Sequence, residues 1–141
     1  DIVYTVGLDG IARLRETGVS KIVYVDRDSP ERLARVRAAL ADVRGIVVTS
    51  SWVTNIEIMP TGVDKGTAVR ALAERLLVPR ESVMCVGDYD NDLPMLAYAG
   101  LPVAMANASD AVRRAARVVT GSNDACGVAQ AVRKYALGRA D

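Results

Sequence analysis

The chain has 141 residues, the size of one ordinary domain, and its formal net charge of +1, without a basic block, argues against nucleic acid as a partner. Half of the residues are hydrophobic, which excludes a disordered chain, and no apolar run reaches the ~18–20 residues of a membrane span, so we expect no membrane partner. The absence of histidine excludes histidine-based triads and zinc–histidine sites, so any catalysis must use carboxylates, lysine, serine, threonine or a hard metal.

Residues 1–60 predict mixed α and β structure. Gly18 is placed to end a first helix, and Ser29 and Pro30 are typical of an N-cap and of the first position of a second helix. Two apolar runs that follow, separated by a few polar residues, favour an antiparallel hairpin. The predicted elements are a helix over 8–17, a strand over 22–25, a helix from 30 to about 40, and strands over 46–49 and 53–58.

After Pro60-Thr61-Gly62 the pattern changes to regular alternation of strands and helices. Short apolar strands that alternate with helices predict a parallel sheet covered by helices. We therefore place a boundary near Pro60, between residues 1–60 and residues 61–141. The predicted elements are helices over 65–77, 92–99, 109–116 and 127–137, and strands over 82–86, 101–105 and 117–119.

The two cysteines do not form an obvious pair. Cys85 lies in an apolar run and Cys126 in a turn-like stretch, 41 positions later. This arrangement is more typical of free thiols in a reducing compartment than of a disulfide or a metal site. We therefore expect the protein to be cytoplasmic.

Three aspartates and an asparagine, in Asp88-Tyr89-Asp90-Asn91-Asp92, directly follow an apolar strand and Gly87. The carboxyl end of a parallel strand is where open α/β sheets bind ligands. Carboxylates this close together repel one another unless a cation or separation relieves them, and hard oxygen ligands suit Mg²⁺. A turn rich in aspartate that caps the next helix explains the same residues equally well, so both interpretations stay open.

Lys65 occupies an unusual place, at the expected start of a helix in Gly62-Val63-Asp64-Lys65-Gly66-Thr67. A lysine is mildly unfavourable there, and the chain otherwise prefers arginine, with 15 Arg against three Lys. A compact ammonium group aimed at an anion is one reason to keep it, and an ordinary helix start is the alternative. The segment is not a P-loop, because the glycine follows the lysine.

Taken together, the two segments resemble motifs III and IV of the haloacid dehalogenase-like phosphatases, with Lys65 followed 23 residues later by Asp88 in Gly87-Asp88-x-x-Asn91-Asp92. Downstream segments are similar to the Cof-type subgroup, namely 95–100, 103–108, 119–123 and 127–129. The resemblance implies an α/β fold in which residues 61–141 form the C-terminal half of a Rossmannoid parallel sheet. Residues 1–60 would be the C-terminal part of an α+β cap of the second class.

The resemblance also implies roles for four side chains. Asp88 would be a direct Mg²⁺ ligand, and Asp92 a second carboxylate of the metal site that orients metal-bound water. Lys65 and Asn91 would bind the phosphoryl group, with Lys65 also neutralising the nucleophile. The implied reaction is Mg²⁺-dependent hydrolysis of a small phosphorylated metabolite, such as a sugar phosphate, through an aspartyl-phosphate.

The family's first motif, Asp-x-Asp-Gly-Thr after a strand, has no counterpart where it should lie. We therefore expect the chain to be a fragment that lacks the nucleophile and is inactive by itself. Half of a parallel sheet would leave one edge strand unpaired, which predicts marginal stability or self-association through that edge.

Two other interpretations stay open. Asp26 follows an apolar strand in Asp26-Arg27-Asp28-Ser29, and Thr49 could supply a second motif, so a phosphatase without a cap could use Asp26 as its nucleophile. The chain could instead be a non-catalytic binding module or a structural remnant. No role is assigned to Arg27, Trp52 or Asn55, and the sequence does not specify the substrate or the oligomeric state.

Overall fold

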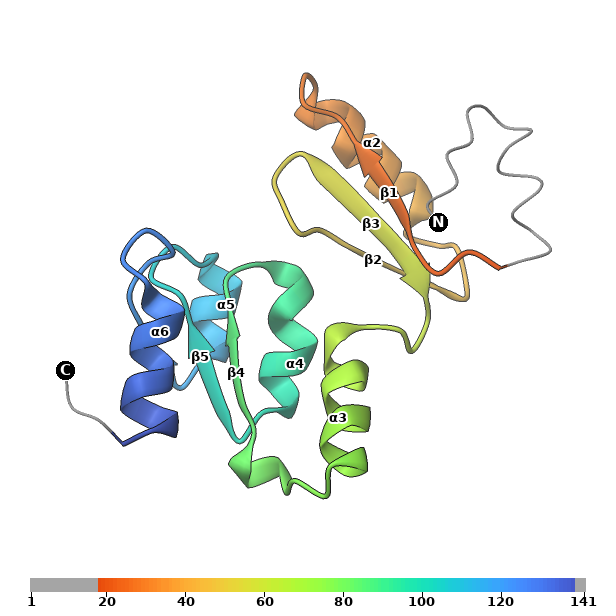
Figure 1. The fold of residues 1–141 in the computed structure, drawn as a ribbon. Coiled ribbons are helices and arrows are strands. Elements are labelled where there is room, and N and C mark those ends of the chain that lie inside the picture. Colours follow the sequence, from red (N-terminus) through yellow and green to blue (C-terminus); the bar gives the residue numbers. More distant parts are fainter. Residues whose placement is uncertain (1–17, 139–141) are drawn as a thin grey trace, which may run out of the picture.

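Residues 18–60 form an antiparallel sheet with a helix on one face (Figure 1). The structure is a computed structural model that describes residues 18–138, so the helix predicted over 8–17 lies outside the described residues. The strand order is β1-β3-β2, and the predicted hairpin is confirmed, with Val48 opposite Ile58 in the ladder. The elements are β1 (Ile22–Val25), α2 (Pro30–Leu40), β2 (Ile46–Thr49) and β3 (Asn55–Pro60).

One face of this sheet is covered by α2 and the other is open, and residues of the central strand β3 alternate between the two faces. Ile56 is fully buried on the side where α2 packs against β3, and Leu33 of α2 is buried with it. Successive strand residues point to opposite faces, so Glu57 and Met59 lie on the other side. The helix begins as predicted, because Ser29 Oγ accepts the Arg32 backbone N–H at 3.2 Å.

The second part of the described chain holds a parallel three-stranded sheet in the order β4-β5-β6, which confirms the predicted α/β architecture. Its elements are α3 (Lys65–Arg75), β4 (Met84–Gly87), α4 (Leu93–Tyr98), β5 (Leu101–Ala104), α5 (Asp110–Ala115), β6 (Val118–Val119) and α6 (Gly127–Ala131). Short 3₁₀ turns at Arg80–Ser82 and Asp90–Asp92 flank β4. The last predicted helix ends differently, because Leu137 N–H bonds to Val132 O and widens the final turn, Val132–Ala136, into a π-helix.

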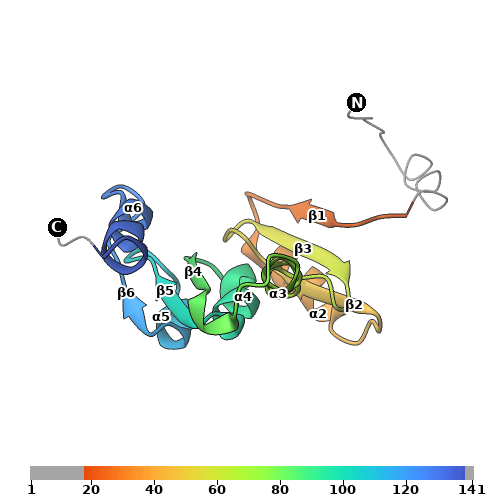
Figure 2. The ribbon, with the colours of Figure 1, turned by 60° about the horizontal axis from the view of Figure 1, so that its bottom comes forward.

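Helices cover both faces of the parallel strands. The helices α4 and α5 pack against the strands and against each other, and α6 lies on the opposite side of the strands from α5 (Figure 2). Leu96, Val103 and Val112 are the large fully buried side chains of this core. Buried alanines such as Ala99 and Ala104 fill the remaining space, which lets helices and strands approach closely without aromatic residues.

The helices α3 and α4 touch at a glycine. A Cβ atom built on Gly66 would lie 2.5 Å from the carbonyl oxygen of Pro94 in α4, well inside contact distance. Because Gly66 follows Lys65, the same packing holds the start of α3 beside the turn Asp90–Asp92, which follows β4.

In the part of the chain that the structure describes, no helix is long and apolar enough to cross a membrane. Cys85 is buried and Cys126 is exposed, and neither takes part in a disulfide. The free thiols that the sequence predicts are thus confirmed.

Gly66→Ala is expected to lower the free energy of unfolding by about 1–3 kcal/mol, because the new methyl group collides with the Pro94 carbonyl. The direction of this change is informative, because replacing glycine by alanine within a helix ordinarily raises the free energy of unfolding by roughly 0.5–1 kcal/mol. Urea unfolding followed by circular dichroism measures the difference. Ala71→Gly, at an exposed position of α3, is the control that measures the effect of helix propensity alone. A Gly66→Ala protein at least as stable as wild type would contradict the close contact.

Candidate active site

The loop after β4 is organised around the carboxylate of Asp92. This side chain is buried, with the residue only 3% exposed. Its Oδ2 atom accepts the backbone N–H groups of Asp88 at 2.9 Å and Tyr89 at 3.3 Å. Gly87 makes the turn possible, because a Cβ atom there would lie 2.6 Å from the Asp92 Cβ. The carboxylate therefore fixes the path of the chain as it leaves the sheet.

The other oxygen of Asp92 pairs with a lysine from a different element. Asp92 Oδ1 accepts a hydrogen bond from Lys65 Nζ, which joins residues 27 positions apart. Lys65 is the first residue of α3, whose start is set by a capping box in which Asp64 Oδ1 accepts the Thr67 N–H at 2.7 Å. The Lys65 side chain is 48% exposed, so its ammonium group contacts Asp92 while remaining accessible.

The three aspartates of the loop separate instead of converging. Within residues 18–138 no group of three histidine, cysteine or acidic side chains is placed to hold a metal ion. Asp90 is exposed and accepts the Ser109 hydroxyl at 3.0 Å, whereas Asp92 turns inward. Asp88 is half-buried and makes no ion pair with another described residue. Separation thus relieves the charge repulsion, and Asp88 keeps a carboxylate available for a cation.

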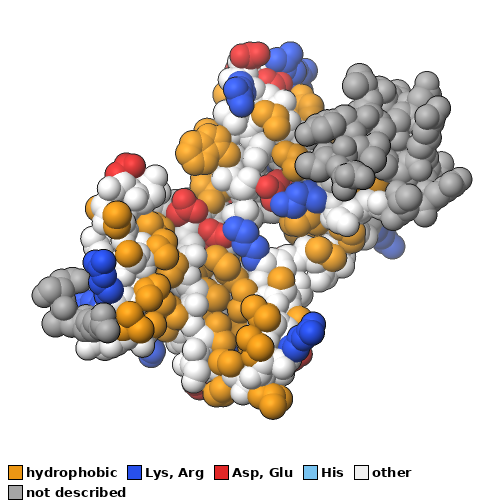
Figure 3. All heavy atoms as spheres, viewed as in Figure 1, with side chains coloured by type: hydrophobic (Ala, Val, Ile, Leu, Met, Phe, Trp, Pro, Cys, Tyr) orange, Lys and Arg blue, Asp and Glu red, His pale blue; other side chains and the backbone are white. Residues whose placement is uncertain are grey.

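A cavity of about 400 Å³ lies between the open face of the antiparallel sheet and the segments that start α3 and α4. On one side it is lined by Lys65, Asn91 and Asp90, and on the other by residues of β2 and β3, among them Thr49 and Glu57. Figure 3 shows acidic and basic side chains gathered where the two parts of the molecule face each other. The volume falls in the usual range for small-molecule sites, roughly 300–1,000 Å³.

The structure brings together most of the residues that the sequence singles out. Lys65 and Asn91 line the cavity, and the buried Asp92 forms an ion pair with Lys65. Asp88 directly follows the carboxyl end of β4, and its backbone N–H bonds to Asp92. The metal and phosphate roles of these residues stay predictions. In this arrangement Asp92 positions Lys65 and the backbone of the loop, because both of its oxygens already accept hydrogen bonds from these groups.

Asp26 lies elsewhere, in the turn between β1 and α2. Its oxygens accept Arg32 Nε at 2.6 Å and the backbone N–H groups of Asp28 at 3.1 Å and Ser29 at 2.9 Å. The hydrogen bond from Arg32 holds the pKa of this carboxyl below its usual value, with the Ser29 and Asp28 N–H groups adding to the effect against partial burial. A carboxylate with these partners, outside the cavity that Lys65 lines, is a structural anchor, which argues against Asp26 as a nucleophile.

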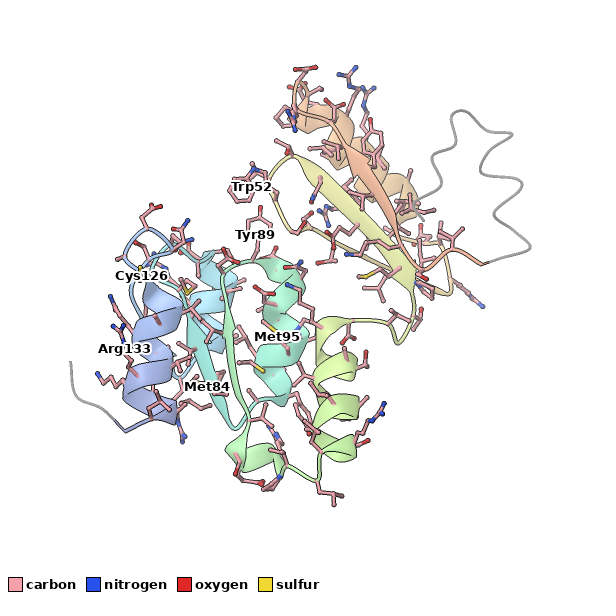
Figure 4. The ribbon with its side chains drawn as sticks, in the orientation of Figure 1. Trp52, Met84, Tyr89, Met95, Cys126 and Arg133 are labelled. Carbon is pink, nitrogen blue, oxygen red and sulfur yellow. The ribbon has the colours of Figure 1, made fainter. Side chains whose placement is uncertain are left out.

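The structure also clarifies the residues without an assigned role. Asn55 Oδ1 accepts the backbone N–H groups of Ser51 at 3.1 Å and Trp52 at 3.2 Å, so Asn55 closes the turn between β2 and β3. Trp52 is 62% exposed and therefore does not belong to the core. In Figure 4 it projects from this turn toward the side of the molecule where Tyr89 lies. Arg27 is exposed.

Sequence reasoning missed Glu57 as a candidate residue. It is a buried carboxylate in the central strand, paired with Lys21, and both line the cavity. The signal was present, since a charged residue between Ile56 and Ile58 in an apolar strand must either find a partner or face a cavity.

The comparisons with known proteins agree with this geometry. The sequence model of the haloacid dehalogenase-like hydrolase family matches residues 8–132, so the chain belongs to that family. A solved haloacid dehalogenase-like hydrolase from B. subtilis shares the fold, with a TM-score of 0.75 and 33% identity over 82% of this chain and 40% of that one. The family resemblance of the motifs is thereby confirmed.

Curated relatives in Bacillus subtilis strain 168 include phosphatases. YxeH is 40% identical over 123 residues, which cover 86% of this chain and 45% of YxeH. The 5-amino-6-(5-phospho-D-ribitylamino)uracil phosphatase YcsE is 42% identical over 90 residues, which cover 64% of this chain and 36% of YcsE. The chain thus spans less than half the length of these relatives.

Asp92→Asn is expected to lower the free energy of unfolding by about 1–3 kcal/mol, because the amide cannot serve both Lys65 and the two backbone donors. The amide signals of Asp88 and Tyr89 in ¹H–¹⁵N spectra should shift strongly, and urea unfolding measures the stability. Asp90→Asn is the matched control, since Asp90 is exposed and accepts only the Ser109 hydroxyl from a side chain. Equal stability of the two variants would contradict the anchoring role of Asp92.

Asp26→Asn is expected to reduce stability near neutral pH and to have no effect in strong acid. The pKa of Asp26 in the folded protein lies below its ordinary value of 3.8, so the carboxylate stabilises the fold above that pH, and this contribution is lost as the pH falls through the folded-state pKa. The urea unfolding midpoint of the variant should therefore lie below that of wild type at about pH 7 and approach it as the pH is lowered to about 2. Asp28→Asn, an exposed residue of the same turn, is the control, and a gap that is constant with pH would refute the ion pair.

Proposed function

We propose that this chain supplies the lysine and the acidic loop of a Mg²⁺-dependent phosphatase that hydrolyses a small phosphorylated metabolite, such as a sugar phosphate. One observation carries the proposal. Lys65 at the start of α3 and Asn91 in the loop that follows Asp88 meet beside one cavity, where the chain leaves the carboxyl end of a parallel strand. This is where open α/β sheets bind their ligands, and the membership of the family supports hydrolysis as the reaction class.

Each residue would act on a phosphoryl group in the cavity. The Lys65 ammonium would offset negative charge on the nucleophile and on the phosphoryl oxygens, and the Asn91 amide would donate a hydrogen bond to one of them. Asp92 would hold Lys65 in place and is a positioning residue in this scheme. Attack of a carboxylate on phosphorus would form an aspartyl-phosphate and break the ester P–O bond, which releases the alcohol. Water would then hydrolyse the aspartyl-phosphate to inorganic phosphate and the free carboxylate.

The donor set suits Mg²⁺, because this loop offers carboxylate oxygens and the chain has no histidine. Asp88 would bind the ion directly, and Asp92 would add a second negative charge beside it while keeping its contact with Lys65. When bound, Mg²⁺ supplies positive charge that favours the phosphoryl group in its transition state.

The nucleophilic aspartate would come from a segment that is not among these 141 residues. In the described part of the sheet, β4 has a partner on one side only, so its other edge could receive a further strand. We assign residues 1–60 to the C-terminal part of a cap and residues 61–141 to half of the catalytic core. The antiparallel and parallel sheets on the two sides of this boundary support the division. Pairing of the free β4 edge with a second copy is the alternative use of that edge.

The chain alone is expected not to hydrolyse p-nitrophenyl phosphate in the presence of Mg²⁺, because its sequence lacks the Asp-x-Asp-Gly-Thr motif that would supply the nucleophile. Joined to the part of its relative YxeH that the match does not cover, which would supply the missing segment, it is expected to become active. Lys65→Met in that chimera should lower kcat about 10²–10³-fold. Steady-state release of p-nitrophenol measures both effects.

Lys134→Met is the matched control for the chimera, since Lys134 is exposed on the C-terminal turn. Its kcat should stay at the parent value. Hydrolysis by the unjoined chain would refute the external nucleophile, and a fully active Lys65→Met chimera would refute the role of Lys65.

A further inference from the structure

Ser109, at the start of α5, uses its hydroxyl group in two directions. The oxygen accepts the backbone N–H of Val112 at 3.4 Å, which caps the helix. The same hydroxyl donates to Asp90 Oδ1 at 3.0 Å, although Asp90 lies 19 positions earlier in the chain. An aspartate would cap the helix as well as serine does, but an ionised aspartate has no proton to donate to Asp90. The cap by itself therefore does not explain why a hydroxyl group occupies this position.

The backbone of Ser109 is also bonded to the acidic loop. Its N–H group donates to the carbonyl oxygen of Asp88 at 3.0 Å. The N–H group of Asp88 donates in turn to Asp92 Oδ2 at 2.9 Å. Both polar backbone groups of Asp88 are thus bonded, one to the residue that precedes α4 and one to the N-cap of α5. The peptide planes on the two sides of Asp88 are therefore held, and the torsions of its side chain are what remains free to change.

The hydrogen bond to Asp90 extends this hold to the exposed part of the loop. Three negative charges within five residues repel one another, which favours a more open loop. Asp90 is exposed and forms no ion pair with another residue of the described chain, so no lysine or arginine there opposes the repulsion at this position. The Ser109 hydroxyl opposes it instead, because it keeps the Asp90 carboxylate at the start of α5.

The residue that these contacts position is Asp88. Its carboxylate makes no ion pair within residues 18–138, so it is the acidic group of the loop that stays available to a cation. A cation that binds a mobile ligand must first order it, and this ordering lowers the affinity. Groups that orient a metal ligand without touching the metal therefore matter, and their removal typically weakens metal binding about 10–100-fold.

We propose that Ser109 is a positioning residue of the metal site, which acts with Asp90 to hold the loop so that the Asp88 carboxylate is pre-organised for a divalent cation. The inference rests on the proposed function, which places Mg²⁺ at Asp88. Ser109 is not among the residues that line the cavity. The metal site thus depends on a residue of α5 that touches neither the cation nor the substrate.

Titration of the ¹⁵N-labelled chain with MgCl₂ measures the affinity of this site without requiring turnover. The amide signals of Asp88 and Tyr89 report binding in wild type. Ser109→Ala is expected to weaken Mg²⁺ binding about tenfold, because it removes the hydroxyl group that holds Asp90. Ser109→Thr keeps both the donor and the cap, and it should bind Mg²⁺ as wild type does. An unchanged Mg²⁺ affinity in Ser109→Ala would overturn the inference.

A double-mutant cycle separates the contact with Asp90 from the helix cap and from the charge of Asp90 itself. Asp90→Ala removes the acceptor and one negative charge but leaves the cap of α5 in place. In the Asp90→Ala protein, the further change Ser109→Ala should alter the Mg²⁺ affinity by less than about twofold. A tenfold loss on both backgrounds would assign the effect to the cap and refute the positioning role.

The comparison of Asp90→Asn with Asp90→Ala leaves Ser109 unchanged, so it decides the question if Ser109→Ala does not fold. Both variants lose the charge, but only asparagine keeps an oxygen that accepts the Ser109 hydroxyl. Asp90→Asn should therefore bind Mg²⁺ at least threefold more tightly than Asp90→Ala. Equal affinities of these two variants would count against the inference and overturn it.

Ser29→Ala is the matched control. Ser29 also caps a helix, through the Arg32 N–H at 3.2 Å, and its hydroxyl also donates to a carboxylate, that of Glu31 at 3.5 Å. It starts α2 on the antiparallel sheet and has no hydrogen bond to the acidic loop. The Mg²⁺ affinity should therefore stay at the wild-type value, and a loss as large as that of Ser109→Ala would show that the effect is not specific to the loop and overturn the inference.

The failure of this inference and the failure of the proposed function give different results. If Mg²⁺ shifts the amides of Asp88 and Tyr89 but the losses from Ser109→Ala and Asp90→Ala are additive, the metal site of the proposed phosphatase stands and the positioning role is refuted. If Mg²⁺ leaves these amides unchanged in wild type, the metal site itself is refuted, and the positioning role with it.

Discussion

The buried carboxylate of Asp92 is the interaction on which the rest of the site depends. One oxygen holds the backbone of the loop after β4, and the other holds the lysine at the start of α3. An ionised group this deeply buried is stable only when both oxygens have strong donors. The sheet edge, the loop and the helix must therefore adopt their positions together, and the close contact at Gly66 allows them to do so.

Much of the fold follows from local patterns in the sequence. Ser29 and Ser109 start helices because their hydroxyl groups accept the N–H three residues ahead, and short apolar strands between helices define the parallel sheet. The grouping of Lys65 with the aspartate loop was also predictable, because the spacing resembles a known pair of motifs. The last helix was the exception, since nothing in its sequence indicates the switch to a π-helix over Val132–Ala136.

The directions of the charged side chains could not be predicted in the same way. Three aspartates at alternate positions look equivalent in the sequence, yet one is exposed, one is half-buried and one is buried. The difference depends on a lysine 27 positions away from Asp92, a contact that no local pattern encodes. Likewise, Glu57 lies in an apolar strand, and only the arrangement of two sheets shows that this strand borders a cavity.

One wall of the cavity belongs to the antiparallel sheet and the other to α3, the loop after β4 and the start of α4, and the chain connects the two walls through a few residues around Gly62. A substitution on the open face of β2 or β3 changes side chains whose backbone bonds lie entirely within the antiparallel sheet. It therefore leaves the ladder of β4, β5 and β6 untouched. Mutation can thus change the side chains of one wall of the cavity while the other wall keeps its lysine and its acidic loop.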